Sequence, residues 1–138
     1  MSNNKKRSRS GFLGVKLSNE ALNNQVEKYN YPGFASSRVK SCIAHTILGI
    51  FGWLSFIGQN QDIDRPIGYA FLIIILVISF LIYKKPKIGV ISAFSIFIIS
   101  ALLTIIYNPA TILGLLIAFY ILAYFIYPAY QVEIKRKN

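Results

Sequence analysis

The chain has 138 residues, of which 54% are hydrophobic and 14% charged, and its formal net charge is +10. This length suits a single domain. Soluble domains carry about 25% charged residues, so lipid rather than water must solvate much of this surface. The lone cysteine, Cys42, excludes an internal disulfide and a metal site made of several cysteines.

The first 40 residues form a basic extension with two unlike parts. Residues 1–10 are polar, and we expect them to contact anionic lipid headgroups or an acidic partner through Lys5, Lys6, Arg7 and Arg9. Nucleic acid is the less favoured partner, because membrane topology also explains the basic excess. The second part contains Ser18, a suitable N-cap for a short amphipathic helix over about 19–29. We expect this helix to rest on lipid headgroups or, alternatively, to dock a partner.

Four apolar segments follow, and each approaches the roughly 20 residues that a membrane-spanning helix needs. They are residues 41–58, 67–83, 88–107 and 110–128. The last two divide one uncharged run that is too long for a single helix, and Pro109 supplies the break. Gly, Ser, Thr and His lower the apolar character of segment 41–58, so its prediction as a span is the weakest of the four.

The distribution of charge supports four spans. Lys and Arg cluster before the first span, between the second and third, and after the fourth. With four spans, every basic residue except Arg65 lies on one side, as the positive-inside bias requires. If segment 41–58 did not cross, the basic extension and the loop at residues 84–87 would face opposite sides. The sequence therefore predicts that both termini are cytoplasmic.

The predicted spans contain no Asp, Glu, Lys or Arg. This removes the buried carboxylates on which proton-coupled transport depends, and also paired-carboxylate catalysis. One His and one Cys cannot assemble a nucleophile with its base and orienting group, and no metal-ligand spacing is present. We therefore expect no catalytic residue, no cofactor and no metal. We interpret His45 as a neutral, hydrogen-bonded side chain, with a pH-sensitive gate, a haem ligand or a headgroup contact as alternatives.

Small and polar residues follow one face of the first span at spacings of three and four. They are Ser41, His45, Gly49, Gly52, Ser55 and Gln59. Small residues let helices approach closely in lipid, so this stripe predicts packing within the chain, packing against another subunit, or the lining of a pore. A second small-residue seam recurs at every fourth position of the fourth span, at Ala110, Gly114 and Ala118.

The predicted fold is all-α: an antiparallel four-helix transmembrane bundle (41–130) with a short cytoplasmic N-terminal extension (1–40) and a basic cytoplasmic tail (131–138). We expect a non-enzymatic accessory or interaction subunit of a larger membrane assembly, in contact with lipid and with other subunits or copies of itself. The alternative is a homo-oligomeric pore-forming or membrane-perturbing effector of the toxin, immunity or phage-defence type. Richness in Asn, Lys, Ile and Tyr suggests an AT-rich genome and favours a bacterial inner membrane, with a plastid or mitochondrial membrane as the alternative.

Overall fold

The computed structural model describes residues 16–30, 33–34, 36–59 and 65–138, and the regular elements in these ranges are helices. The short helix α1 spans Asn19–Glu27. The long helices are α2 (Ser37–Gln59), α3 (Arg65–Lys84), α4 (Pro86–Tyr107) and α5 (Ile112–Lys137). A 3-10 turn, Pro109–Thr111, leads into α5.

Local signals in the sequence set the helix ends. The side chain of Ser18 accepts a hydrogen bond of 3.3 Å from the backbone N–H of Ala21 and caps α1. Pro86 lies at the start of α4, where a missing N–H leaves no helical bond unmade, and only Lys85 separates this helix from α3. Asn108 is extended, with φ of −147°, so the uncharged run breaks before Pro109 as the sequence predicts.

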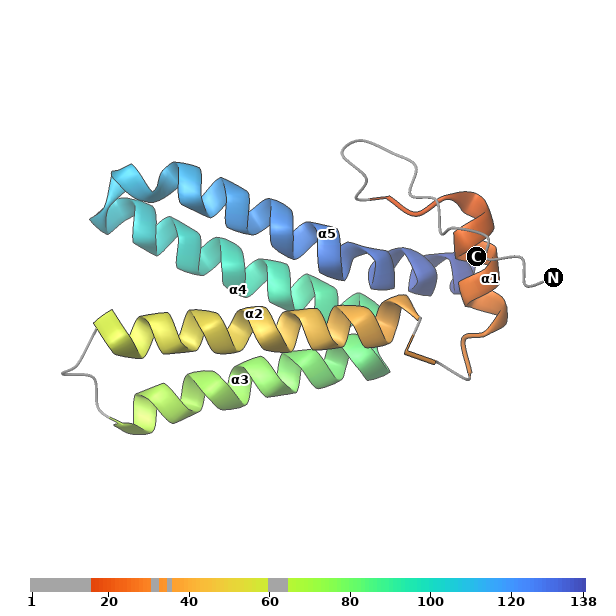
Figure 1. The fold of residues 1–138 in the computed structure, drawn as a ribbon, viewed down its shortest axis with the longest axis horizontal. Coiled ribbons are helices and arrows are strands. Elements are labelled where there is room, and N and C mark those ends of the chain that lie inside the picture. The colour runs from red at the N-terminus through yellow and green to blue at the C-terminus, as the bar shows by residue number, and fades with distance from the viewer. Residues whose placement is uncertain (1–15, 31–32, 35, 60–64) are drawn as a thin grey trace.

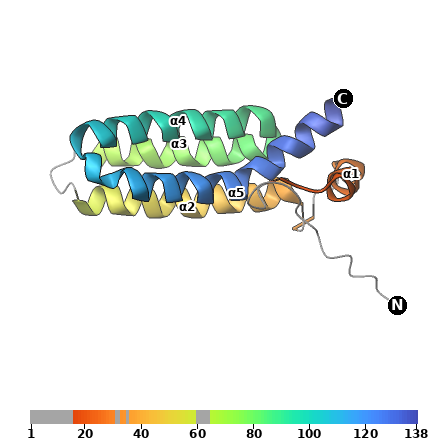
Figure 2. The same cartoon turned by 90° about the horizontal axis from the view of Figure 1, so that it is seen from above.

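The long helices lie side by side along the longest axis of the molecule, and successive ones run in opposite directions (Figure 1). Helix α2 packs against α3 and α5, and α4 packs against the same two helices. Helix α1 lies across one end, where it contacts α5 (Figures 1 and 2). That end also holds the start of α2, the turn between α3 and α4, and the end of α5.

The core is small, and much of the apolar surface faces outward. Buried side chains from three helices form the core: Ile78, Ile82, Val90, Ala93, Leu122, Ile126 and Ala129. Large apolar side chains such as Leu102, Leu113 and Ile106 are exposed. Soluble proteins rarely expose continuous apolar surface of this kind, whereas lipid solvates it.

Three of the described helices are long and apolar enough to cross a membrane. They are Pro66–Lys84, Pro86–Ile106 and Pro109–Lys137. These correspond to three of the segments that the sequence predicts as spans, and together with the outward apolar surface they are consistent with a membrane protein. Helix α2 is not among these three, and the side chains of its residues 55, 56, 58 and 59 lie outside the described part of the structure.

Candidate functional site

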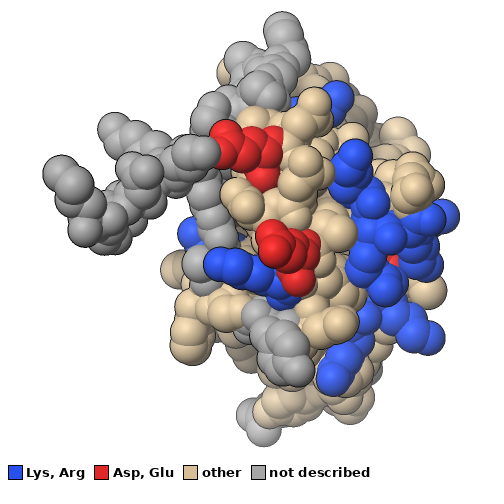
Figure 3. Space-filling view, turned by 90° about the vertical axis from the view of Figure 1, so that its right-hand side faces the viewer, with Lys and Arg blue, Asp and Glu red and all other residues tan. Residues whose placement is uncertain are grey.

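The end of the molecule that carries α1 is strongly basic, and we call it the basic end. Figure 3 faces this end and shows Lys and Arg gathered over one part of it. The described cations of the long helices and of the turn between α3 and α4, apart from Arg65, belong to segments that meet here: Arg38, Lys40, Lys84, Lys85, Lys87, Lys135, Arg136 and Lys137. Charges that are separated in the sequence are therefore collected on one side of the bundle.

An apolar contact attaches α1 to the end of α5. Leu17, Leu22 and Val132 are buried together, and Val26 and Tyr29 pack against them. The backbone N–H of Leu17 donates to the side-chain carbonyl of Gln131 over 2.9 Å. The face of α1 that the sequence assigns to headgroups or to a partner is thus turned toward α5. The reason is that α5 continues to Lys137, so that residues 131–137 of the predicted tail (131–138) are helical.

Tyr29 lies at the centre of a polar cluster on the same side of α1. Its hydroxyl donates to the carboxylate of Glu133, and its ring lies between the guanidinium groups of Arg38 and Arg136, at 3.8 and 4.3 Å from the ring centroid. Burial raises the pKa of the Tyr29 phenol, and the hydrogen bond to Glu133 raises it further. The phenol therefore stays protonated and remains a donor.

Glu133 is a carboxylate with only 4% of its surface exposed. A buried charge needs partners, and Arg136 and Lys137 provide them at 3.0 and 3.4 Å. Arg38 joins further elements to the cluster, because its guanidinium donates to the backbone carbonyls of Tyr29 and Tyr83. The cluster thus fastens α1, α2, α3 and α5 together at the basic end.

The first half of the polar stripe on α2 is used for contacts within the chain. Ser41 is fully buried, and its hydroxyl donates to the carbonyl of Phe125 over 2.6 Å. Phe125 lies one turn before Pro128, a proline inside α5, and Figure 2 shows α5 bending as it approaches α1. Pro128 cannot donate to the carbonyl four residues earlier, that of Tyr124. The Ser41 hydroxyl bonds the adjacent carbonyl, that of Phe125, and so joins α2 to α5 near the proline.

His45 and Gly49 contact α3. The Nδ1 atom of His45 lies 2.8 Å from the hydroxyl of Ser79. Because Ser79 donates its own proton to the carbonyl of Ile75, its oxygen accepts from His45. A Cβ placed on Gly49 would meet the side chain of Ile75. Among the described residues, no group of three His, Cys, Asp or Glu side chains is arranged to hold a metal.

The second half of the stripe does not contact the chain in the same way. A Cβ on Gly52 would meet no atom within 4 Å, and Gly52 is exposed. The side chains of Ser55 and Gln59 lie outside the described part of the structure, as do Lys5, Lys6, Arg7 and Arg9. The stripe therefore divides after Gly49. Its residues up to Gly49 contact other helices of the chain, whereas Gly52 faces away from them.

The second small-residue seam that the sequence predicts also faces largely outward. Ala110 and Gly114 are exposed, and Ala118 is half-buried. A Cβ on Gly114 would meet no atom within 4 Å. Gly114 therefore has open space beside it within the described chain.

Three structurally important residues are not singled out by the sequence analysis. Glu133 precedes Arg136 and Lys137 by three and four residues, which is the spacing of ion pairs on a helix, so its pairing was detectable. Gly89 packs against the backbone of α3, where a Cβ would lie 2.6 Å from the Cα of Ile82. The only signal for it is a glycine placed shortly after a tight turn. Nothing in the sequence indicates the contacts of Arg38.

The chain matches no protein-family model, and comparison with curated proteins and with solved structures finds no significant match.

Proposed function

We propose that the chain is a four-span membrane protein that serves, without catalysis, as an interaction subunit of a larger membrane assembly. Helix α2 has 23 residues, which corresponds to about 34 Å at a rise of about 1.5 Å per residue. That length suits a hydrocarbon core of about 30 Å. Helix α2 packs along α3 and α5, which are both long and apolar enough to cross a membrane. A helix lying alongside two spans shares their depth, and this supports α2 as the fourth span of an antiparallel transmembrane bundle.

The basic end supports an orientation with both termini in the cytoplasm. Lys and Arg near span ends are retained on the cytoplasmic side, and the described cations of the long helices other than Arg65 belong to segments at this end. On this proposal α1 and the Tyr29–Glu133 cluster lie at the cytoplasmic surface. The bacterial inner membrane remains the favoured location.

The observation that carries the functional proposal is the outward position of Gly52. Gly49 is covered by Ile75 of the same chain, whereas Gly52, less than one turn further on, exposes its backbone away from the other helices. Gly114 of α5 does the same. Exposed glycine on a membrane helix suits close approach by another helix. The partner that we propose for this surface is a transmembrane helix of another subunit.

The pore alternative has less support. A pore between copies of the chain would need the polar stripe to face a common axis. Ser41 and His45 are buried and already bonded to α5 and α3. Of the described stripe, this leaves mainly Gly52 to face such an axis, and a glycine alone does not make a polar lining.

Size measurement of the full chain in mild detergent tests the interaction subunit, with glycine variants as probes. We expect the chain from native membranes to migrate as a complex larger than a monomer. Gly52→Leu should dissociate this complex and leave the monomer folded, because a Cβ at this position meets no described atom within 4 Å. Gly49→Leu should instead destabilise the monomer by about 1–3 kcal/mol, as overpacking does.

The control is Leu113→Ile, which changes the shape of an exposed apolar side chain next to Gly114 without changing its size. It should leave both the complex and the monomer unchanged. A monomeric wild-type chain would contradict the interaction subunit. Loss of membrane potential on expression, abolished by Gly52→Leu, would favour the pore instead.

A further inference from the structure

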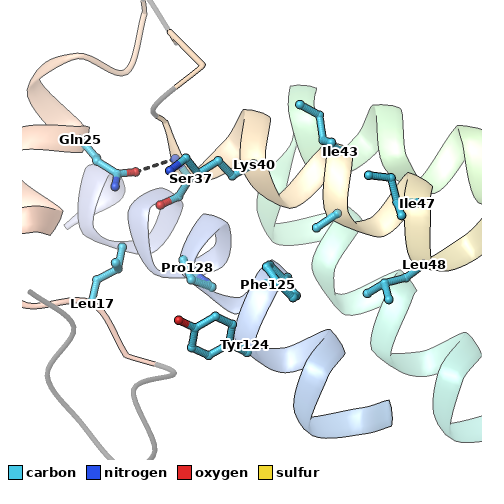
Figure 4. Close-up of a pocket in the computed structure, with 11 residues that line it drawn as sticks. Leu17, Gln25, Ser37, Lys40, Ile43, Ile47, Leu48, Tyr124, Phe125 and Pro128 are labelled. Atoms are coloured by element: carbon cyan, nitrogen blue, oxygen red, sulfur yellow. Dashed lines mark hydrogen bonds between the residues drawn. The ribbon is translucent and has the colours of Figure 1, made fainter. Parts of the chain in front are cut away.

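A cavity of about 760 Å³ lies between α1, the first half of α2 and the bent part of α5 (Figure 4). This volume falls within the roughly 300–1,000 Å³ of small-molecule sites. The cavity has an apolar part, lined by Ile43, Ile47, Leu48 and Phe125. It also has a polar end, lined by Gln25 and Lys40. Figure 4 shows Gln25, Ser37 and Lys40 near the start of α2, with Ile43, Ile47 and Leu48 further along that helix.

The apolar part of the cavity is open toward the outside of the bundle. Ile43 and Ile47 line it and are 46% and 49% exposed. They lie one and two turns beyond Lys40 on α2, so the lining changes from cationic to apolar over about 10 Å of helix rise. In the proposed membrane orientation, Lys40 lies near the headgroups and the two isoleucines lie at the depth of acyl chains.

Gln25 lines the polar end of the cavity and carries a buried hydrogen-bond donor. Its side-chain oxygen accepts from the backbone N–H of Ser37 over 2.8 Å and so caps α2. This bond fixes the orientation of the amide, because only the oxygen can accept. The amide nitrogen, Nε2, is therefore the other atom, and it is buried with no hydrogen-bond partner among the described residues. Gln25 as a whole is only 9% exposed.

A buried donor without a partner is unfavourable, and an acceptor brought beside it relieves that cost. Lys40 adds a positive charge, and the described lining residues include no Asp or Glu. The acceptor that fits is thus an anionic oxygen, such as that of a phosphate. A free anion would leave the apolar wall uncovered, whereas a lipid supplies an anionic headgroup and an acyl chain in one molecule.

We propose that this cavity binds one anionic phospholipid. The headgroup phosphate accepts hydrogen bonds from Gln25 Nε2 and Lys40 Nζ, and one acyl chain lies along Ile43, Ile47 and Phe125. The site rests on the proposed membrane position of α2. It does not depend on the assembly with another subunit, because every residue involved belongs to one chain.

The experiment measures lipid-dependent thermal stability of the full chain in a neutral detergent. Phosphatidylglycerol and phosphatidylcholine with the same acyl chains are titrated separately, and inorganic phosphate is a third arm. We expect phosphatidylglycerol to stabilise the chain at about tenfold lower concentration than phosphatidylcholine, as one charge-assisted contact allows. Inorganic phosphate should have no effect. Equal stabilisation by the two lipids, or stabilisation by phosphate alone, would overturn the proposal.

Variants test whether the preference for phosphatidylglycerol depends on this cavity. Gln25→Glu keeps an oxygen for Ser37 and replaces the Nε2 donor with a second acceptor, so the preference for phosphatidylglycerol should disappear. Lys40→Gln should weaken the preference for phosphatidylglycerol by about tenfold. This variant provides the test if Gln25→Glu does not fold. Lys87→Gln removes an exposed cation of α4 that does not line the cavity, and it should keep the preference. A preference unchanged in Lys40→Gln, or lost equally in Lys87→Gln, would refute the site.

The assembly test remains separate from this one. Should the chain prove monomeric while phosphatidylglycerol stabilises it through Gln25 and Lys40, the interaction subunit fails and the lipid site stands. If the chain forms the larger complex but shows no preference for phosphatidylglycerol, the lipid site fails and the interaction subunit stands.

Discussion

The hydroxyl of Tyr29 donates to the carboxylate of Glu133, although the two residues are 104 positions apart in the sequence. This contact joins the segment after α1 to the last turns of α5. Arg38 and Arg136 enclose the Tyr29 ring from two sides. The segment that precedes α2 is therefore anchored to the end of α5, and α1 is part of the folded structure at the basic end.

Removal of the Tyr29 hydroxyl should release α1. In Tyr29→Phe, Glu133 keeps Arg136 and Lys137 but loses its link to the N-terminal segment, at a cost of about 1–2 kcal/mol. We expect faster hydrogen exchange at the amides of Asn19–Glu27 and unchanged exchange in the core of α3 and α4. Tyr69→Phe, at an exposed tyrosine of α3, is the control. Equal exchange in both variants would show that the hydroxyl does not hold α1.

The Ser41 hydroxyl should contribute more than other hydroxyls on α2. Ser41→Ala removes the donor to the Phe125 carbonyl near Pro128, and we expect a loss of about 1 kcal/mol. Thr46→Ala is the matched control, because the Thr46 hydroxyl donates to Cys42 within the same helix. Thermal aggregation in detergent ranks the two variants. If Ser41→Ala were no less stable than Thr46→Ala, the contact between α2 and α5 would not be important for stability.

Gly89 should not tolerate a methyl group. A Cβ at this position meets the backbone of Leu81 and Ile82, which cannot move without separating α3 from α4. Gly89→Ala should therefore destabilise the chain, although alanine is favoured over glycine in a helix by about 1 kcal/mol. Gly114→Ala is the control, since nothing lies near its Cβ, and the monomer should become slightly more stable. Matching stability in the two variants would contradict the close approach of α3 and α4.

The sequence predicts helix ends far better than helix contacts. Ser18 and Pro109 act on their own neighbours, and the start of α1 and the break before α5 are found at these residues. Contacts depend on which faces meet in three dimensions. Gly49 and Gly52 look alike in the sequence, yet only Gly49 is covered by another helix of the chain.

The end of α5 shows a second limit of sequence reasoning. Its basic residues predict a cytoplasmic tail, and the structure adds that the helix continues to Lys137 and buries Gln131, Val132 and Glu133. Basic composition describes the exposed side of this segment. Its other side is defined by α1, which is more than 100 residues away in the sequence. Only the tertiary structure brings the two segments together.

The most direct test of the central claim is the accessibility of single cysteines on the two sides of the membrane. Lys28→Cys, Asp62→Cys, Lys85→Cys, Asn108→Cys and Lys135→Cys are placed separately in a Cys42→Ser background and labelled in intact cells with a membrane-impermeant maleimide. If α2 crosses the membrane, positions 62 and 108 label from outside, and positions 28, 85 and 135 label only after the membrane is opened. Labelling of positions 28 and 62 from the same side would show that α2 does not cross, and the four-span account would be wrong.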